Sequence, residues 1–393
     1  MSNLSPDKIR EIVDRLPTTR DEDWKYTDLA RARDISTRWI DAGAQPAAVS
    51  LEDQAGEITG SIDAAWIVIA NGSLLGIPEG LDAARHDAAP AGDNALAELN
   101  AALLIDGVRI HVDGQLERPI GLLFIDSADD ASVSQGYVEI ECAPSSACDI
   151  VEYHATSGSG DHYANTMLKL HVGDNASVNH VRIQGRALTH VQTGRTAVAI
   201  GRDARFVSAS FDLGGALIRN DLVIDIASPG AEVSFDGLYL AGDGQHIDNH
   251  TRVDHKAGPA TSRQEYRGIL NGQCRCVWNG KAIVHQGADG TDADQANHNL
   301  LLSAKAEIDA KPELEIYTDD VKCSHGTTVG QLDENAMFYL RSRGLDRRHA
   351  TQVLTHAFAT GLVSRVPVEA AREAINTLME ARLVELVDKE LEQ

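Results

Sequence analysis

Four short segments between residues 147 and 233 share one pattern: ACDI at 147–150, ASV at 176–178, ARF at 204–206 and AEV at 231–233. In each, an alanine follows a polar turn and precedes a strand with alternating apolar residues, and AEI at 306–308 repeats the pattern later. The first four alanines are 29, 28 and 27 residues apart. Such a near-constant period is typical of a solenoid, in which each coil buries its apolar face against the next.

The strand pattern extends in both directions from these segments. From Arg109 to Tyr317, Val, Ile and Phe alternate with polar residues in short runs that Gly, Asp, Asn and Pro separate. We therefore expect a mainly β protein with a parallel β-helix core over residues 106–330. A β-sandwich with regularly spaced hairpins is the alternative, and the scarcity of dipeptides typical of tight hairpin turns disfavours it.

Helical patterns precede this core. Ser5-Pro6 is a good helix start, and apolar residues recur at helical spacing until Pro17, which predicts a helix over residues 6–16. WIVIA at 66–70, followed by Asn-Gly, predicts a buried strand closed by a turn, and a short helix is expected near 95–103. Residues 1–105 are thus assigned to a helical or mixed N-terminal region.

Helical patterns also follow the core. Three helices are predicted, over 333–343, over 347–363 and from Pro367 onward. One face of the second is expected to carry Ala350, Val353, Leu354, Ala357 and Phe358. Residues 331–393 should form a small helical domain, whose apolar stripe either packs on itself or receives a partner.

Charge and cysteine content restrict the class of protein. The chain has 35 Lys and Arg against 59 Asp and Glu, a net charge of -24, which disfavours nucleic acid and anionic membranes as partners. The charged N-terminus lacks the apolar core of a signal peptide, and the longest apolar run, Ala64–Ala70, is too short to span a bilayer. Five cysteines without disulfide-framework spacing indicate a reducing compartment, so we expect a cytoplasmic protein.

Familiar enzyme motifs are absent from the sequence. It contains no Walker A segment, no G-x-S-x-G elbow and no H-E-x-x-H helix. Asp319-Asp320 could serve a carbohydrate-active β-helix enzyme, in which two carboxylates share acid and base roles. Adjacent residues on a strand point to opposite faces, however, so a solvated edge is the preferred interpretation.

Two pairs of cysteines are interpreted as structural. Cys274 and Cys276 would share one face of a strand, and thiolates suit iron or zinc. No second pair at matching spacing accompanies them, which favours two small buried side chains in the solenoid interior. Cys142 and Cys148 have no His or basic residue near them in sequence and are also interpreted as buried side chains.

Cys323 and His325 form a better candidate site. Lying two apart in an extended segment, they share a face, and thiolate with imidazole is a competent half-site for iron. The pair supplies only two ligands, so a metal ion bound there would need ligands from another molecule. The alternative is a packed or merely polar turn.

The sequence around this pair resembles a known family. PELEIYTDDVKCSHGTTVGQLDENAMFYLRSRGL at 312–345 is similar to the signature of the SufD branch of the SufB/SufD family. Further similarity lies in DEDWKYTDL at 21–29, GQHIDNHTRVDH at 244–255, YRGILNGQ at 266–273 and TDADQANHNLLLS at 291–303. SufB proteins typically carry an acidic residue on each side of the corresponding His, whereas His325 lies between Ser324 and Gly326, which favours the SufD branch.

The resemblance implies a right-handed parallel β-helix between helical regions, and a non-catalytic scaffold subunit of the SUF complex for iron-sulfur cluster assembly. It implies SufB as a partner at the C-terminal end of the β-helix, and the SufC ATPase as a partner of the helical domain at 331–393. Cys323 and His325 map onto the SufB interface, where a nascent cluster is expected to form, and no stably bound cofactor is expected.

Other functions and assemblies stay open at this point. A stand-alone iron-binding protein is the main alternative, although three or four ligands in one region are missing from the sequence. A carbohydrate-active enzyme is less favoured, because aromatic residues make up only 5% of the chain. An uncapped solenoid end could also pair with a second copy, giving a homodimer in isolation.

Overall fold

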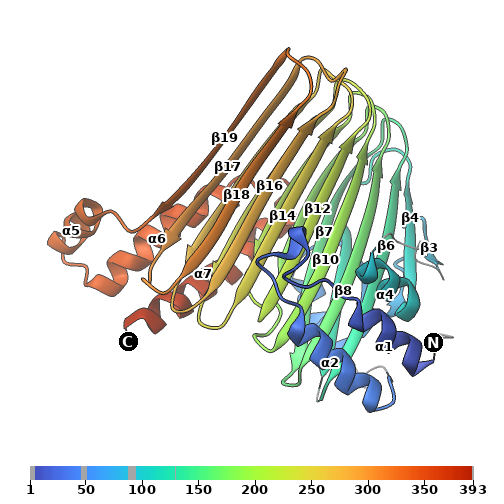
Figure 1. The fold of residues 1–393 in the computed structure, drawn as a ribbon, viewed down its shortest axis with the longest axis horizontal. Coiled ribbons are helices and arrows are strands. Elements are labelled where there is room, and N and C mark those ends of the chain that lie inside the picture. The colour runs from blue at the N-terminus through green and yellow to red at the C-terminus, as the bar shows by residue number, and fades with distance from the viewer. Residues whose placement is uncertain (1–4, 46–50, 87–93, 129, 392–393) are drawn as a thin grey trace.

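The chain winds as a parallel β-helix in the computed structural model, which describes residues 5–45, 51–86, 94–128 and 130–391. After the first three strands, successive strands alternate between two sheets, so each pairs with the strand two places away in sequence (Figure 1). We call the space between the sheets the lumen. The expected mainly β fold with flanking helices is confirmed.

The larger sheet, sheet A, has ten strands, in the spatial order β19 (Val321–Gly330), β17 (Thr291–Leu301), β15 (Thr261–Leu270), β13 (Glu232–Ala241), β11 (Arg205–Asp212), β9 (Ser177–Gln184), β7 (Ala147–Gly158), β5 (Ile120–Ala128), β1 (Ala65–Ala70) and β2 (Ser73–Gly76). Sheet B has nine, in the order β18 (Glu307–Ile316), β16 (Arg275–Val284), β14 (His246–His255), β12 (Leu217–Ile226), β10 (His190–Ile200), β8 (His162–Val172), β6 (Ser132–Cys142), β4 (Gly107–Val112) and β3 (Ala83–His86). Among the strands that the structure describes, only the pairs β1–β2 and β3–β4 are antiparallel.

Stacked turns explain the repeated alanine. Asn175 and Asp203 have φ values of 63° and 53°, in the left-handed region that Asn and Asp tolerate, and each reverses the chain just before an alanine. The carbonyl of Ala176 accepts a hydrogen bond from the Arg205 N–H of the next coil at 2.8 Å. In the preceding coil the left-handed residue is Ser145, with a φ of 63°, and the small buried residue after it is Ser146. Ala147, the first alanine of the sequence pattern, pairs with Ser177 and so lies one position later in its coil than Ala176 does.

The fifth occurrence of the pattern has a different place in the fold. Ala306 precedes β18 in sheet B, whereas Ala176, Ala204 and Ala231 precede strands of sheet A. Ala260, which precedes β15 and is also buried, continues the sheet A row instead. The AEI segment at 306–308 therefore resembles the repeat without being its next member.

Rows of apolar side chains fill most of the lumen. One row of sheet B is in register across five strands, and each of its residues is at most 2% exposed: Ile140, Leu170, Val198, Ile224 and Val253. A parallel register stacks each such side chain on its equivalent in the next coil, and this stacking buries the apolar face that a single coil would expose.

The N-terminal helices cover the outer face of sheet B. They are α1 (Pro6–Asp14), α2 (Ala30–Asp41) and α4 (Ala95–Leu103), whereas α3 (Glu52–Ser61) lies against β5 of sheet A. Between α1 and α2, a segment with the 3-10 turn η1 (Glu22–Trp24) crosses the sheet: the Trp24 ring packs over the Arg219 guanidinium at 4.3 Å, and the Thr27 hydroxyl donates a hydrogen bond to the buried Asp248. The helices expected at 6–16 and 95–103 are thus present, while α2 and α3 were not predicted.

The expected strand at 66–70 joins the solenoid. β1 ends in a turn at Asn71 and Gly72, whose φ values are 49° and 80°, and pairs on its other side with β5 in parallel. Left-handed Asn-Gly turns suit the twist of a hairpin. Sheet A therefore begins within the segment that the sequence assigned to the N-terminal region.

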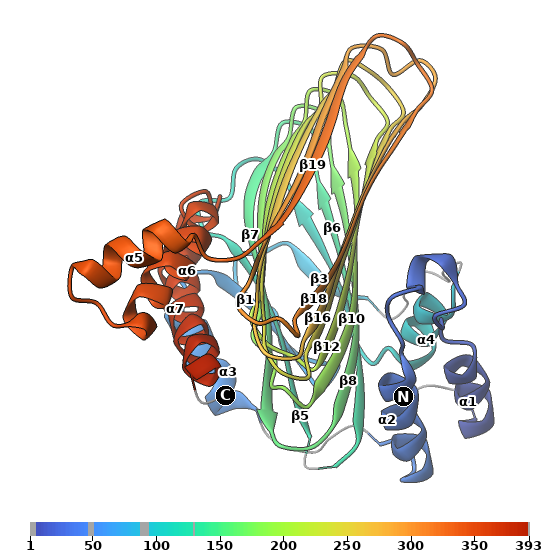
Figure 2. The same cartoon turned by 60° about the vertical axis from the view of Figure 1, so that its left-hand side comes forward.

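The three C-terminal helices are present as α5 (Glu334–Ser342), α6 (Arg347–Val363) and α7 (Glu369–Leu391). In Figure 2, α6 and α7 lie against sheet A, on the side opposite the N-terminal helices. Their apolar residues share one cluster with the outer face of sheet A, so the stripe does not pack only on itself. None of the helices among the described residues has the length and apolar character needed to cross a membrane.

The predicted face of α6 is partly wrong. Val353 is 46% exposed and Ala357 is exposed as well, while Thr351, Thr355 and Ala359 are buried. The Thr355 hydroxyl donates to the Thr351 carbonyl at 2.9 Å, which removes the cost of burying it. A threonine whose hydroxyl bonds to the backbone of its own helix can be buried on a face where helical periodicity predicts apolar residues.

Candidate functional site: the open end of the β-helix

The last coil of the solenoid, formed by β18 and β19, has no neighbour on its outer side among the described strands. In the register of sheet A, Cys323 pairs with Ala293 and His325 with Gln295. Ala293 and Gln295 are 1% and 2% exposed and face the lumen. Because parallel pairing preserves the facing of side chains, Cys323 and His325 lie on the lumen side of the open coil.

Cys323 is the most accessible cysteine of the chain. Of the five cysteines, it alone is not buried, and all five are free thiols. Partial burial raises the pKa of its thiol above the ordinary value. The isolated chain therefore presents a protonated thiol, and a metal ion that binds there must displace the proton.

Apolar side chains face this pair across the lumen. The lumen-facing residues of β18 and β19 form what we call the end face: Ile308, Ala310, Pro312, Leu314, Ile316, Cys323, His325, Thr327 and Val329. Ile316 is 41% exposed and Val329 54%, although equivalent positions in inner coils are buried. The end face is thus a section through the lumen of a β-helix, open to solvent.

The other residues that the sequence singled out lie elsewhere. Asp319 and Asp320 occupy the exposed turn between β18 and β19, not a strand, so their carboxylates are solvated. Cys274 and Cys276 are buried in the lumen core, as expected. Cys142 and Cys148 are also buried there, with sulfur atoms 3.8 Å apart. Throughout the described ranges, no three His, Cys, Asp or Glu residues gather closely enough to hold a metal ion.

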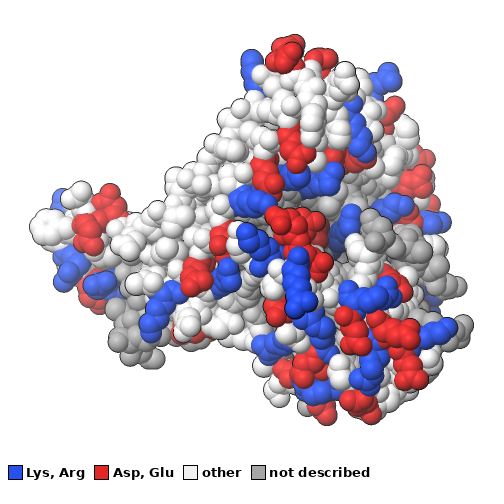
Figure 3. Space-filling model, viewed as in Figure 1, with Lys and Arg blue, Asp and Glu red and all other residues white. Residues whose placement is uncertain are grey.

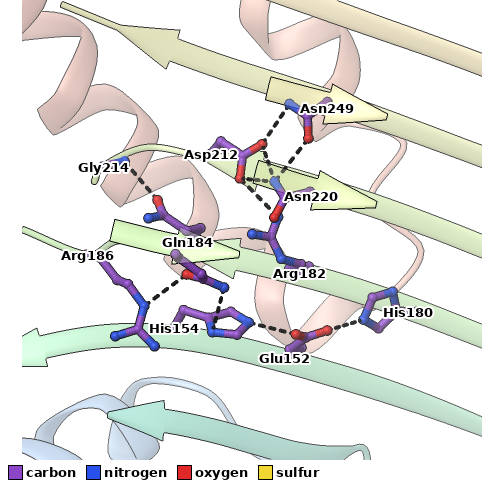
Figure 4. Close-up of polar contacts among 11 residues, drawn as sticks. Glu152, His154, His180, Arg182, Gln184, Arg186, Asp212, Gly214, Asn220 and Asn249 are labelled. Atoms are coloured by element: carbon purple, nitrogen blue, oxygen red, sulfur yellow. Dashed lines mark hydrogen bonds and ion pairs between the residues drawn. The ribbon is translucent and has the colours of Figure 1, made fainter. Parts of the chain in front are cut away.

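A polar network inside the lumen was not predicted (Figure 4). The Glu152 carboxylate lies between two imidazoles, 2.6 Å from His154 Nε2 and 3.0 Å from His180 Nε2. Burial by itself would raise the pKa of Glu152, but these hydrogen bonds outweigh it and hold the pKa well below its usual range. Burial also lowers the pKa of His154 to about 4, so this imidazole is neutral at physiological pH.

A second set of polar contacts lies beside the first. The Asp212 carboxylate accepts hydrogen bonds from Arg182 at 2.9 Å, from Asn220 at 3.1 Å and from Asn249 at 3.0 Å (Figure 4). Glu152 and His180 are 28 residues apart, and Arg182 and Asp212 are 30 apart. The signal was therefore in the sequence: polar residues recur with the coil period at positions where the alternation expects apolar ones.

A groove of about 670 Å³ lies on the outer face of sheet B, beside η1. Figure 3 shows lysines and arginines interspersed with acidic residues over this side of the molecule. The basic residues that line the groove are largely paired, as in Arg252 with Asp254 at 2.6 Å and Lys281 with Glu315 at 2.5 Å. Such mixed charge differs from the continuous basic surface that nucleic acid requires.

Comparison with protein families matches residues 124–358 to the SufBD core domain of the SUF system for FeS cluster assembly. The chain belongs to the SufB/SufD family. The matched residues include most of the lumen and the whole end face, with Cys323 and His325. Membership agrees with the resemblance noted in the sequence and assigns the chain to iron-sulfur cluster assembly.

Individual SufB/SufD relatives align with most of the chain. The iron-sulfur cluster assembly protein SufD of Escherichia coli is 26% identical over 384 residues, 94% of this chain and 89% of the relative. The SufBD family protein slr0076 of Synechocystis is 28% identical over 405 residues, 94% and 88% of the two chains. SufD of Bacillus subtilis is 25% identical over 309 residues, 76% and 69%. The chain is thus a SufD-type member of the family.

Proposed function

We propose that this SufD-type chain is a non-catalytic scaffold subunit of a cytoplasmic SUF complex, which pairs through its end face with SufB and through its C-terminal helices with the SufC ATPase. The end face carries this proposal. It combines two open edge strands, exposed lumen residues and a Cys-His pair in one surface.

The end face suits a second β-helix as partner. Edge strands with free N–H and C=O groups are templates for pairing, and proteins normally cover or charge them. On this face, apolar residues such as Ile316 and Val329 are also exposed, and a partner would bury them. A paralogue of the same fold could continue both sheets and the lumen. A second copy of this chain could do the same in isolation, which would give a homodimer.

The iron-sulfur cluster under construction is the cargo of this site. Cys323 would supply a thiolate and His325 an imidazole, as an iron ligand or as a hydrogen-bond donor to sulfide, and SufB would supply the remaining ligands. Iron that binds Cys323 displaces its proton, since the thiol has a raised pKa. In this proposal, both subunits contribute iron ligands at their shared interface.

The C-terminal helices suit a docking role. α5 contains no buried residue, and it exposes Phe338 by 74% and Tyr339 by 57%. Val353 adds a nearly half-exposed apolar side chain on the neighbouring α6. Aromatic side chains of this kind are common anchors at interfaces. Movement of SufC upon ATP hydrolysis would act on these helices and shift the end face between closed and open arrangements.

Reconstitution tests the scaffold role. The purified chain is mixed with SufB and SufC from the same organism and separated by size-exclusion chromatography with mass measurement. We expect one stable complex of all three proteins, with ATPase activity that depends on SufC alone. Failure of the chain to join the complex would contradict the proposal.

Replacing His325 tests the site. His325→Ala should leave the complex intact and lower cluster assembly by roughly tenfold or more, as measured by activation of an apo iron-sulfur enzyme. His171→Ala, which removes an exposed imidazole from the outer face of β8, is the matched control and should assemble clusters normally. Normal assembly by His325→Ala would remove the role assigned to this residue.

A stand-alone iron-binding protein is the second candidate function. The accessible Cys323 and His325 pair favours it, if the isolated chain completes the site without SufB. Iron analysis of the chain purified alone under anaerobic conditions distinguishes the two. Stoichiometric iron, lost in Cys323→Ser, would favour the stand-alone protein over the scaffold.

A further inference from the structure

The strand that carries Cys323 and His325 is an edge strand. β19 pairs with β17 on one side and has no described strand on its other side. Most of its residues are exposed, whereas those of the inner strands of sheet A are mostly buried or half-buried. A strand with little buried surface and one neighbour opens more readily than an inner strand. The geometry of the Cys-His pair therefore depends on how firmly β19 is held to β17.

The sequence of β19 weakens the strand further. Gly326, which directly follows His325, and Gly330 both lie in it, and no atom lies within 4 Å of the place that a Cβ atom on either would take. Glycine lowers the stability of a strand, because it loses more conformational freedom on folding and has no side chain to pack. Thr328, between the two glycines, is hydrogen-bonded to His298 of β17 at 2.9 Å. This contact holds the end of the strand beyond the site.

Another side-chain contact holds the strand within the site itself. Ser324 lies between Cys323 and His325 in the chain, so its side chain points to the opposite face, the outer face of sheet A. There it pairs in register with Asp294 of β17, and its hydroxyl donates a hydrogen bond to the Asp294 carboxylate. A charged acceptor makes this bond stronger than one between neutral groups.

The lumen side offers no comparable contact. Among the described residues, neither Cys323 nor His325 is hydrogen-bonded to another side chain. The positions of both side chains therefore follow from the backbone of β19. The bond from Ser324 to Asp294 restrains that backbone at the residue that joins the two.

We propose that Ser324, bonded to Asp294, is a positioning residue that holds Cys323 and His325 in place to receive iron. Ligands that are fixed before binding lose less conformational freedom when the metal arrives, so they bind it more tightly. Ser324 itself points away from the end face and contributes no ligand.

The inference deepens the proposed function and rests on it for the role of the pair in cluster assembly. The contact between Ser324 and Asp294 needs neither SufB nor iron. Opening of β19 is therefore measured in the isolated chain, and cluster assembly in the complex. The two measurements can fail separately.

Hydrogen exchange of the isolated full-length chain, followed by mass spectrometry, tests the contact. Ser324→Ala should raise the exchange rate of the peptide that contains Cys323 and His325 by about three- to tenfold. Asp294→Ala should raise it by a similar factor. The double variant should exchange no faster than either single variant, because both substitutions remove the same bond. Ser324→Thr keeps a hydroxyl at this position and should exchange like the wild type.

Asn179→Ala is the matched control. The Asn179 amide donates to the Asp149 carboxylate at 2.9 Å, which is also a contact between neighbouring strands on the outer face of sheet A. β9, however, pairs with β7 on one side and with β11 on the other. Loss of this contact should therefore change the exchange rate of its own peptide by less than about twofold.

Cluster assembly with SufB and SufC tests the positioning role. Ser324→Ala should join the complex and assemble clusters roughly threefold more slowly or worse, and Ser324→Thr should restore the rate. Unchanged exchange in Ser324→Ala, or normal assembly by this variant despite faster exchange, would overturn the inference. A wild-type chain that assembles no clusters with SufB and SufC would contradict the proposed function instead, and the exchange rates would still report on the Ser324–Asp294 contact.

Discussion

Individual glycines determine where the lumen can hold a large aromatic residue. Tyr239 is fully buried, and its hydroxyl is hydrogen-bonded to Asn299 and, at 3.0 Å, to Asn297. Its ring lies over Gly268 of the next coil, where a Cβ atom would approach Tyr239 Cε2 to 2.2 Å. Rows in a β-helix contact each other directly, so a large side chain in one coil requires a small one beside it.

We expect Gly268→Ala to lower the free energy of unfolding by about 1–3 kcal/mol, because the methyl group displaces Tyr239 from its hydrogen bonds. Gly194→Ala is the matched control: it also lies in a strand and faces the lumen, but its Cβ would meet the nearest atom, Thr166 Oγ1, at 3.4 Å, an ordinary contact. Urea unfolding of both variants measures the difference. Equal stability of the two would contradict this account of Gly268.

At the scale of elements, the C-terminal helices pack against the solenoid in addition to the docking role proposed for them. Ile375 and Met379 of α7 are fully buried in the cluster that α6 and α7 share with the outer face of sheet A. Val384, on the same helix, is 43% exposed. The two sides of α7 thus have different roles, and only one of them contributes to folding.

Ile375→Ala should destabilise the chain by about 2–5 kcal/mol, since it opens a cavity between α7 and the sheet. Val384→Ala, a similar truncation on the exposed side, should change stability by less than about 0.5 kcal/mol. Chemical denaturation measures both. A similar small effect for the two variants would show that α7 is not held against sheet A.

At the scale of the whole molecule, helices cover both sheets of the solenoid, but its C-terminal end is open. N-terminal helices cover sheet B, C-terminal helices cover sheet A, and the end face is left without a cover among the described residues (Figure 2). A lumen that is apolar in most coils is thereby exposed at its last coil. The proposed assembly with a partner would explain this arrangement, because a chain that acts alone is expected to cap the end of its solenoid.

If SufB binds the end face as proposed, Val329→Lys should weaken that binding by roughly tenfold or more while the chain stays folded, because Val329 is 54% exposed and the partner would bury the new charge. Leu188→Lys changes a similarly exposed apolar residue away from the end face and is the control. Titration by light scattering or calorimetry compares the two. Equal affinity would place the SufB interface elsewhere.

The sequence by itself determined the period of the solenoid, its turns, most of the helices, and the Cys323–His325 pair. Each of these depends on local properties: left-handed turn residues such as Asn175 and Asp203, alternation along one strand, or two side chains two positions apart. Such features can be predicted from the local sequence, without knowing which residues lie beside them in the folded chain.

Only the tertiary structure decided which residues meet across coils. Glu152 and His180, or Gln295 and His325, become neighbours through the register of parallel strands, which depends on the exact length of each intervening turn. The coil length varies along the chain, so spacing alone does not identify these pairs. The buried face of α6 likewise depends on the sheet it covers, and the exposure of the end face depends on where the last coil stops.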